Sequence, residues 1–369
     1  MSADFPWGFG GVVPPEDSVG AAGLARAGKI VAAAVGDGGI PGAVAAVGRG
    51  PVTRSTWVAG WGDTTPGKAR PMTAGTLFDL ASLTKVVATT TAVLALAGRG
   101  QLDLDDPSAR YLPEFTALRD GHVTIRHLLT HTSGLPDTRK FYQWCSCREE
   151  LLRDLFATPI EAPPGTRVTY SDLGFIALGE IVAAIAGRPL DEAVGDLVTG
   201  PLGMTSTGYN PVAAPDRFAA TERQEDGTPV NGVVHDENAR LMGGVAGHAG
   251  LFSVATDLAA FCAWWVGDGD TAVPAALRRD AESAQTDGLG GNRGLGWVRG
   301  GDRYDILGRH WPTSAVSHTG FTGISLALDS PSRVWEVLLT NAVHFGRDAT
   351  ASKALRREFS AAVATAFFR

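Results

Sequence analysis

Cysteine and positive charge are both scarce in this chain of 369 residues. Its cysteines, Cys145, Cys147 and Cys262, are too few for a disulfide scaffold and lack the spacing of a structural zinc site. We therefore expect free thiols in a reducing compartment. Lys and Arg number 32 against 39 Asp and Glu, a net charge of −7, and no basic run appears. A nucleic-acid partner is therefore not expected.

Two kinds of apolar segment are also missing. The N-terminus carries Asp4, Glu16 and Asp17 before its first basic residue, Arg26, whereas a secretory signal needs a basic start and an apolar core. The longest apolar stretch, residues 86–97, contains three threonines and is shorter than the ~20 residues of a membrane span. The sequence thus predicts a cytoplasmic protein that does not enter a membrane.

The composition, 44% hydrophobic and 19% charged, is close to ordinary globular usage. Strand-like patterns lie near both ends of the chain, at residues 42–48, 54–61, 295–299, 315–318, 323–328 and 334–339. Helical patterns are expected at residues 16–35, 84–97, 125–129, 149–156, 171–186, 190–198, 256–266 and 350–368. This order suggests a discontinuous α/β domain with an antiparallel sheet, built from residues 1–83 and 290–369, and a mainly helical domain of residues 84–289.

The strongest chemical signal is FDLASLTK, residues 78–85, in which Ser82 enters an apolar helix and Lys85 follows one turn later. A desolvated amine can serve as the base for a serine nucleophile, because burial lowers the pKa of lysine. The helix N-terminus also offers N–H groups to an oxyanion. Taken alone the motif is weak, since Ser82 could cap the helix and Lys85 could lie at the surface.

Two further motifs follow. PPGTRVTYSDL, residues 163–173, delivers Tyr170 just before a helix, although for this motif alone a buried tyrosine with Ser171 or Asp172 as the helix cap is the better interpretation. In SHTGFTG, residues 317–323, glycines interrupt a strand and would let a substrate approach the backbone, although a bulge would look the same.

In this order the three motifs resemble those of serine β-lactamases and penicillin-binding proteins, most closely the class C β-lactamase-like branch of serine esterases and D-amino-acid peptidases. The stretches 126–136 and 243–253 are similar too, so the resemblance spans about residues 42–343. It implies a β-lactamase/transpeptidase-like α/β fold, in which N- and C-terminal helices flank an antiparallel sheet and a helical domain is inserted. The active site would lie in the cleft between sheet and insertion.

The resemblance also implies residue roles. Ser82 would be the acylated nucleophile, Lys85 and Tyr170 would move its proton, and the N–H groups of Ser82 and Phe321 would form the oxyanion hole. The residues expected to contact substrate are Asp172, His318, Thr319, Gly320 and, from an aromatic loop that is either a lid or a surface turn, Trp144. No cofactor is implied, and His127 and His131 lack the further ligands of a metal site.

Two positions depart from the family pattern. His318 replaces a lysine that helps to hold the carboxylate of a β-lactam, so esters and amides are favoured as substrates. Asp172 replaces a common asparagine; a carboxylate there favours a charged Lys85 and shifts the base role toward Tyr170. Aligning residues 171–173 with the S-D-N element of other β-lactamases is disfavoured by Leu173.

The sequence therefore predicts a serine hydrolase or acyltransferase that acylates Ser82 from a small ester, lactone or amide. The acyl group would pass to water or to an amine or alcohol, which the aromatic loop at Trp144 could help to bind. Two alternatives stay open: a β-lactamase or D-aminopeptidase, and a non-catalytic acyl-binding sensor on the same fold. The sequence does not define the oligomeric state.

Overall fold

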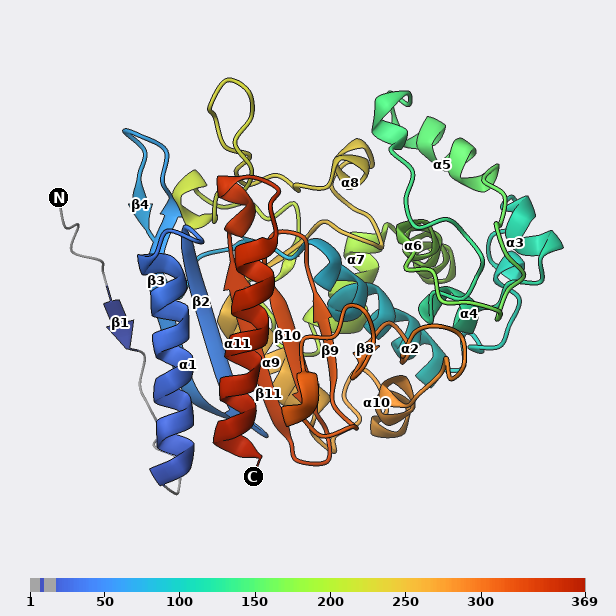
Figure 1. Cartoon of the computed structure of the whole chain (residues 1–369). Coiled ribbons are helices and arrows are strands. Elements are labelled where there is room, and N and C mark those ends of the chain that lie inside the picture. The colour runs from blue at the N-terminus through green and yellow to red at the C-terminus, as the bar shows by residue number, and fades with distance from the viewer. Residues whose placement is uncertain (1–6, 10–17, 369) are drawn as a thin grey trace.

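The computed structural model describes residues 7–9 and 18–368, and among these an eight-stranded sheet is the largest β structure (Figure 1). Seven strands follow the order β1-β3-β2-β11-β10-β9-β8, and β4 pairs with β3. Their bounds are β1 (Trp7–Phe9), β2 (Gly42–Arg49), β3 (Val52–Asp63), β4 (Arg70–Pro71), β8 (Val298–Arg299), β9 (Val316–Thr319), β10 (Ser325–Asp329) and β11 (Val334–Thr340). All the pairings are antiparallel, which confirms the predicted sheet built from both ends of the chain.

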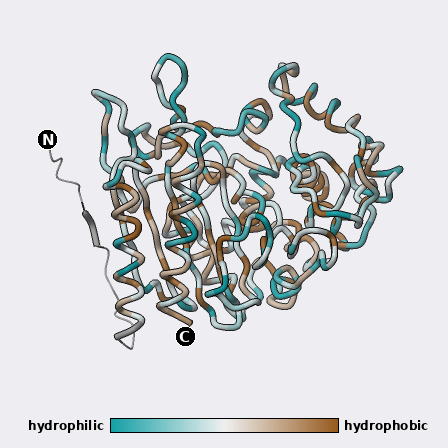
Figure 2. Tube along the Cα trace, viewed as in Figure 1, coloured by the Kyte–Doolittle hydropathy of each residue, from teal (hydrophilic) through white to brown (hydrophobic). Residues whose placement is uncertain are grey.

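Two helices from opposite ends of the chain cover one face of this sheet. The helices α1 (Ser18–Gly36) and α11 (Thr350–Phe367) pack side by side (Figure 1). Successive strand residues point to opposite faces, so Ala43, Ala45 and Val47 of β2 join the core under these helices while Val44 and Ala46 join the core on the other face. In Figure 2 hydrophobic segments run through the sheet and the helices against it.

The other face of the sheet meets the helical part of the chain. The segment that contains Ser82 and Lys85 runs through a 3₁₀ turn (Ala81–Leu83), a π-helix (Lys85–Thr90) and α2 (Thr91–Gly98). The stretch 81–98 is long and apolar enough to cross a membrane by length and composition, which exceeds the sequence expectation, yet 83% of it is buried inside the protein. This stretch is therefore a helix of the protein core, because neighbouring elements cover its apolar side chains on all sides.

The remaining helices include all those that the sequence patterns predict in this part of the chain, each within one or two residues of its expected bounds. They are α3 (Thr116–Asp120), α4 (Ile125–Leu129), α5 (Arg148–Phe156), α6 (Asp172–Ala186), α7 (Leu190–Val194) continued by a π-helix (Gly195–Thr199), α8 (Glu237–Leu241), α9 (Ala255–Trp265) and α10 (Ala275–Glu282), of which α3, α8 and α10 were not predicted. A small second sheet has the order β5 (Phe78–Asp79), β7 (Leu251–Ser253), β6 (Gly208–Tyr209). The first predicted helix, residues 16–35, corresponds to α1, and its residues 16 and 17 lie outside the described residues.

Two predicted strands are shorter than expected. Strand β8 covers only the end of residues 295–299 because Gly296, with φ +77°, turns its N–H toward the Leu129 carbonyl. Strand β10 starts late because Gly323, with φ +112°, belongs to a tight turn. The predicted division into two domains stays a prediction; α9, from inside the range 84–289, lies against β2 and β11.

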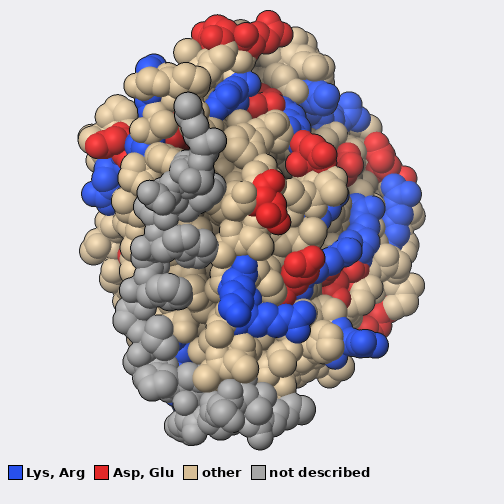
Figure 3. Space-filling model, turned by 60° about the vertical axis from the view of Figure 1, so that its left-hand side comes forward, with Lys and Arg blue, Asp and Glu red and all other residues tan. Residues whose placement is uncertain are grey.

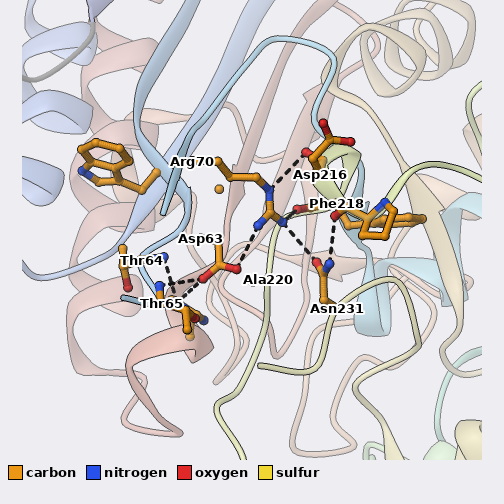
Figure 4. A network of polar contacts seen from close by, with 12 residues as sticks. Asp63, Thr64, Thr65, Arg70, Asp216, Phe218, Ala220 and Asn231 are labelled. Carbon is orange, nitrogen blue, oxygen red and sulfur yellow. Dashed lines mark hydrogen bonds and ion pairs between the residues drawn. The ribbon is translucent and has the colours of Figure 1, made fainter. Parts of the chain in front are cut away.

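An ion-pair network fixes the strand β4 to a distant loop. Arg70 pairs with Asp63 of β3 at 2.9 Å and also donates to the carbonyls of Asp216 and Phe218 and to Asn231 (Figure 4). This guanidinium therefore ties the end of β3 to the segment 216–231. That segment leads directly into His235, which lies at the site described below.

Candidate active site

The backbone before Ser82 is held in an unusual conformation. Ala81 has φ +42°, a left-handed value that residues with a Cβ rarely adopt. The Asp79 Oδ1 atom accepts a hydrogen bond from the Ala81 N–H at 2.8 Å, and the Leu80 N–H donates to the Leu251 carbonyl at 2.9 Å. These bonds place the half-buried Ser82 at the start of the central helix.

Lys85 is completely buried, which overturns the alternative that it lies at the surface. Its Nζ atom donates to Ser82 Oγ and to the His248 carbonyl, each at 3.0 Å, and lies 2.7 Å from Asp172 Oδ1. Burial acts to lower the pKa of Lys85, but the Asp172 carboxylate outweighs it, so the pKa is raised above its ordinary value. Lys85 is thus an ammonium group bridging Ser82 and Asp172.

Tyr170 reaches the same point from the start of α6. The side chain of Ser171 caps this helix by accepting from the Gly174 N–H at 3.2 Å, so the capping alternative holds for Ser171, while Tyr170 lines the same cavity as Ser82. The Tyr170 hydroxyl is within hydrogen-bonding reach of Ser82 and Lys85. Burial raises the pKa of Tyr170 despite the nearby ammonium, so its side chain is a neutral phenol.

The third motif closes the other side of the site with a tight turn rather than a bulge. The Gly320 N–H donates to the Ile324 carbonyl at 2.8 Å, and a Cβ at Gly320 would lie 2.8 Å from the Leu80 carbonyl oxygen. The hydroxyl of Thr322 donates to the Asp79 carbonyl at 2.9 Å. The turn after β9 therefore packs directly on the backbone that presents Ser82.

His318 is buried and neutral. Its Nδ1 atom lies 2.9 Å from the Thr319 carbonyl, which can only accept, so Nδ1 carries the proton. Its Nε2 atom has no hydrogen-bond partner among residues 7–9 and 18–368. Burial holds the pKa of His318 well below its usual range, and the positive charge of Lys85 adds to this effect. The residue at this position therefore offers a lone pair where the family pattern has a cation.

Two cavities meet at Ser82 and Phe321. One, of about 400 Å³, is also lined by Tyr170, His318, Thr319 and Gly320. The other, of about 230 Å³, is also lined by Tyr142, His235 and Asn238. The Phe321 ring is 50% exposed and stacks on His235 at 5.5 Å. Within the described part of the chain, the backbone N–H groups of Ser82 and Phe321 have no hydrogen-bond acceptor, so both are free to bind a ligand.

Trp144 is placed differently from the sequence expectation. It lines neither of these cavities, is 55% exposed, and donates from its indole N–H to Asp154 Oδ2 at 2.8 Å. Its ring packs on Phe141 at 5.6 Å. This loop is therefore anchored to α5, and of residues 141–144 it is Tyr142 that lines the smaller cavity.

The two histidines considered as metal ligands have other partners. His127 Nδ1 accepts from the Thr124 N–H at 3.2 Å, and His131 Nδ1 accepts from the Ser171 N–H at 2.9 Å. No group of three or more His, Cys, Asp or Glu with metal-site geometry occurs among the residues that the structure describes.

Arg293 is a site residue that the sequence did not reveal. It lines the larger cavity, is 1% exposed, and forms two hydrogen bonds of 3.0 Å with the carboxylate of Asp302. It lies in the glycine-rich segment 290–296, which has no periodic pattern. The position of Arg293 at the site follows only from the packing of this segment against Tyr170. Its guanidinium carbon lies 5.7 Å from the centre of the Tyr170 ring.

Comparison with known proteins agrees with this geometry. The sequence model of the family described as Beta-lactamase matches residues 27–361. The chain belongs to the Beta-lactamase family. An N-acetylmuramyl-L-alanine amidase of Bacillus subtilis is 34% identical over 74% of this chain and 69% of its own length. A putative D-alanyl-D-alanine carboxypeptidase of Escherichia coli is 33% identical over 74% of this chain and 70% of its own.

Solved structures of this family share the fold. EstCE1, described as a hydrolase with promiscuous acyltransferase activity, has a TM-score of 0.75 at 24% identity and covers 92% of this chain and 100% of its own. A class C β-lactamase mutant has a TM-score of 0.73 at 19% identity, with coverage of 94% and 99%. The predicted β-lactamase/transpeptidase-like fold is confirmed, and the protein is a serine hydrolase of the β-lactamase type.

Proposed function

We propose that Ser82 takes the acyl group of a small ester, lactone or amide and passes it to water or to an amine or alcohol. One observation carries this proposal. Lys85 Nζ lies 3.0 Å from Ser82 Oγ and 2.7 Å from Asp172 Oδ1, with Tyr170 in reach, at the point where two cavities meet. Ser82 therefore has groups that can take its proton within reach. The two cavities beside it offer room for the acyl group and the leaving group of a substrate.

The charges of Lys85, Asp172 and Tyr170 suggest which residue accepts the proton of Ser82 and which one donates a proton to the leaving atom. A protonated Lys85 can accept the Ser82 proton only as it gives its own to Asp172, and the 2.7 Å contact supports that relay. A neutral Tyr170 is suited to donate a proton to the leaving atom. This assignment differs from the sequence expectation, which placed the base role on Tyr170, because burial keeps the Tyr170 phenol protonated.

The free N–H groups of Ser82 and Phe321 would hold the oxygen of the tetrahedral intermediate. Two backbone donors converging on one point form the usual oxyanion hole of acyl transfer, and removal of one such donor costs about 10²–10³ in rate. The strained residue Ala81 directly precedes the first donor, and the closely packed Gly320 directly precedes the second.

Among the candidate substrates, amides and esters are favoured over β-lactams. His318 offers no cation to the carboxylate of a β-lactam. The curated relatives are named as an amidase and as putative carboxypeptidases, names that denote cleavage of amide bonds. A β-lactamase, a D-aminopeptidase and a non-catalytic acyl sensor are the competing functions.

The test is the intact mass of the protein after exposure to activated esters, N-acyl amides and β-lactams, with turnover followed in parallel. Ser82→Ala should abolish labelling by an uncharged phosphonate and lower ester turnover by several orders of magnitude, because the nucleophile is gone. Ser146→Ala, at an exposed serine, is the matched control. Labelling that persists in Ser82→Ala contradicts the proposal, and acylation without turnover identifies a sensor.

A further inference from the structure

A third cavity, of about 680 Å³, lies at the ends of the strands that point away from Ser82. Strand β9 begins two residues after Ser314, which lines this cavity, and ends at Thr319, which lines the larger cavity beside Ser82. Among the described residues, none that lines the third cavity also lines a cavity beside Ser82. The third cavity is therefore a separate place, and its volume lies in the range of small-molecule sites, roughly 300–1,000 Å³.

Two arginines fix the walls of the third cavity. Arg278 of α10 is 1% exposed and donates to four backbone carbonyls of residues 265–273, the loop that follows α9. Arg299 of β8 donates to the carbonyls of Glu282 and Thr313. These bonds hold the surrounding segments in place, so a ligand would not have to order them when it binds.

A buried carboxyl group with one free oxygen lies in this cavity. Glu282 is 6% exposed, and its Oε1 atom accepts from the indole N–H of Trp265 at 2.7 Å and from the Ser330 hydroxyl at 2.6 Å. Its Oε2 atom has no partner within the described part of the chain, yet it is open to solvent. Burial raises the pKa of Glu282 to about 7, Asp329 adds to this effect and Arg278 opposes it. A cation in the cavity would supply the partner that a buried carboxylate requires.

The exposed charges that line the cavity are Arg279, Arg333 and Asp268. Each arginine approaches the Asp268 carboxylate, with nitrogen–oxygen distances of 3.9 Å for Arg279 and 3.7 Å for Arg333. The Asp268 side chain is 80% exposed, so both contacts are solvated and weak. A ligand carboxylate can therefore enter between the two guanidinium groups, while Asp268 accepts an ammonium group.

These features together select a ligand with charges of both signs. A ligand with only positive charge would be repelled by the arginines of the lining, and one with only negative charge by Glu282. An aliphatic chain between the charges would pack on the apolar residues of the lining, which are Val266, Ala275, Ala284 and Pro331. A basic amino acid has this combination, because its aliphatic side chain separates a cation from a carboxylate with a neighbouring ammonium group.

We propose that the third cavity binds a free basic amino acid such as arginine. Its side-chain cation pairs with Glu282 Oε2, and its carboxylate lies between Arg279 and Arg333. Its α-ammonium group lies at Asp268. The C-terminal residue of a peptide can carry the same side-chain cation and carboxylate but has an amide in place of the α-ammonium group.

Isothermal titration calorimetry with L-arginine and L-citrulline at pH 8 tests the pairing with Glu282. Citrulline has nearly the same shape but a neutral side chain, so it should bind about tenfold more weakly, because a charge-assisted hydrogen bond is lost. Glu282→Gln should bind both ligands equally weakly, and its amide oxygen can still accept from Trp265 and Ser330. Glu192→Gln, at an exposed glutamate of α7, is the matched control and should bind as the wild type does.

The pH dependence of binding gives a second measurement on the same group. Arginine should bind to the wild type about tenfold more weakly at pH 6 than at pH 8, because a protonated Glu282 cannot pair with a cation. The other charged groups near Glu282 are Arg278 of α10, Arg299 of β8 and Asp329 of β10. Glu282→Gln retains these groups, so loss of the pH dependence in this variant assigns it to Glu282.

The carboxylate end has its own variant. Arg333→Gln should weaken the binding of arginine about threefold, as expected for an exposed ion pair, and Arg26→Gln, at an exposed arginine of α1, should not. Ester turnover in these variants should match the wild type, because the cavity lies away from Ser82, and it shows that each variant is folded.

Three results would overturn the proposal. Citrulline bound as tightly as arginine, or arginine bound equally by the wild type and Glu282→Gln, excludes the pairing of a cation with Glu282. No binding of arginine at millimolar concentration excludes the site as a whole. N-acetyl-L-arginine bound as tightly as arginine excludes the free amino acid and assigns the cavity to a peptide C-terminus. All three leave the proposed acylation of Ser82 intact.

Discussion

The 2.7 Å contact between Lys85 Nζ and Asp172 Oδ1 sets the charge of the group nearest to Ser82. With an asparagine at position 172, burial would lower the pKa of Lys85 without an opposing carboxylate, and only the contact with Tyr170 would still raise it. In this chain the carboxylate favours a protonated Lys85, and in the proposed mechanism it accepts the proton that Lys85 gives up. In the proposed mechanism, the replacement of an asparagine amide nitrogen by a carboxylate oxygen at position 172 therefore changes which residue finally holds the proton of Ser82.

Tyr170→Phe tests the role of the phenol at the same scale. As the acid, Tyr170 should matter most for a poor leaving group, so we expect a loss of about 10²–10⁴-fold in kcat/KM with ethyl acetate. With p-nitrophenyl acetate the loss should be much smaller, because nitrophenolate departs without a proton. Steady-state kinetics on both esters measures the contrast. Equal losses would instead support a base role, and wild-type activity on both would leave Tyr170 as a packing residue.

At the scale of the elements, Asp79 joins three segments. Its carboxyl oxygens accept from the N–H groups of Ala81 and His235, at 2.8 and 2.6 Å, and its carbonyl accepts from Thr322. Asp79, which is buried, therefore fixes three segments: the turn before Ser82, the loop that contains His235, and the third motif. The Arg70 network in Figure 4 holds the base of that same loop.

Gly320→Ala tests how closely these elements must pack. Its Cβ would lie 2.6 Å from Ile324 Cγ1 and 2.8 Å from the Leu80 oxygen, so the third motif must move away from Ser82. We expect a loss of roughly 1–3 kcal/mol of stability, as for an overpacked core, together with a fall in turnover. Thermal unfolding and ester kinetics measure both. Gly36→Ala, where an added Cβ meets nothing within 4 Å, is the control; a Gly320→Ala protein with wild-type stability and turnover would contradict the close packing.

The elements that the sequence predicted best are those specified locally. The hairpin of β2 and β3 follows from the turn at Gly50-Pro51, and α6 follows from the Ser171 cap and its apolar run. Ser82, Lys85 and Tyr170 were found because their motifs are contiguous. Arg293 was missed, and Trp144 was placed at the site, because their positions depend on contacts made by segments far apart in sequence.

At the scale of the whole molecule, charge is spread widely over the surface. On the face shown in Figure 3, basic and acidic side chains are interspersed. The cysteines Cys145, Cys147 and Cys262 are free thiols. The cytoplasmic location expected from the sequence stays a prediction.

One buried acid makes the stability of the molecule depend on pH. Glu336 of β11 is 1% exposed, and burial raises its pKa to about 8, whereas an unfolded glutamate has a pKa of about 4.3. The folded state thus holds this proton more tightly. Its stabilising contribution is fully present below about pH 4 and is lost as pH rises through about 8.

Glu336→Gln should remove this dependence. The variant should be more stable than the wild type at pH 8 by roughly 1–3 kcal/mol, with a smaller gain at pH 5. Urea unfolding at several pH values measures it, and Glu192→Gln, at an exposed glutamate, is the control. If the free energy of unfolding depends on pH in the same way in the wild type and in Glu336→Gln, then Glu336 has the same pKa in the folded and unfolded states, which contradicts this prediction.

The pairing of β2 with β11 joins residues 42–49 to residues 334–340. Such a non-local contact closes slowly, and at a translation rate of ~5–20 residues per second the exposed edge of β2 waits on the order of tens of seconds for its partner to leave the ribosome. The segment bearing Ser82 is synthesised early in that interval. The nascent chain therefore carries Ser82 long before β11 and α11 have left the ribosome, although residues of α11 line the same cavity as Ser82 in the folded protein.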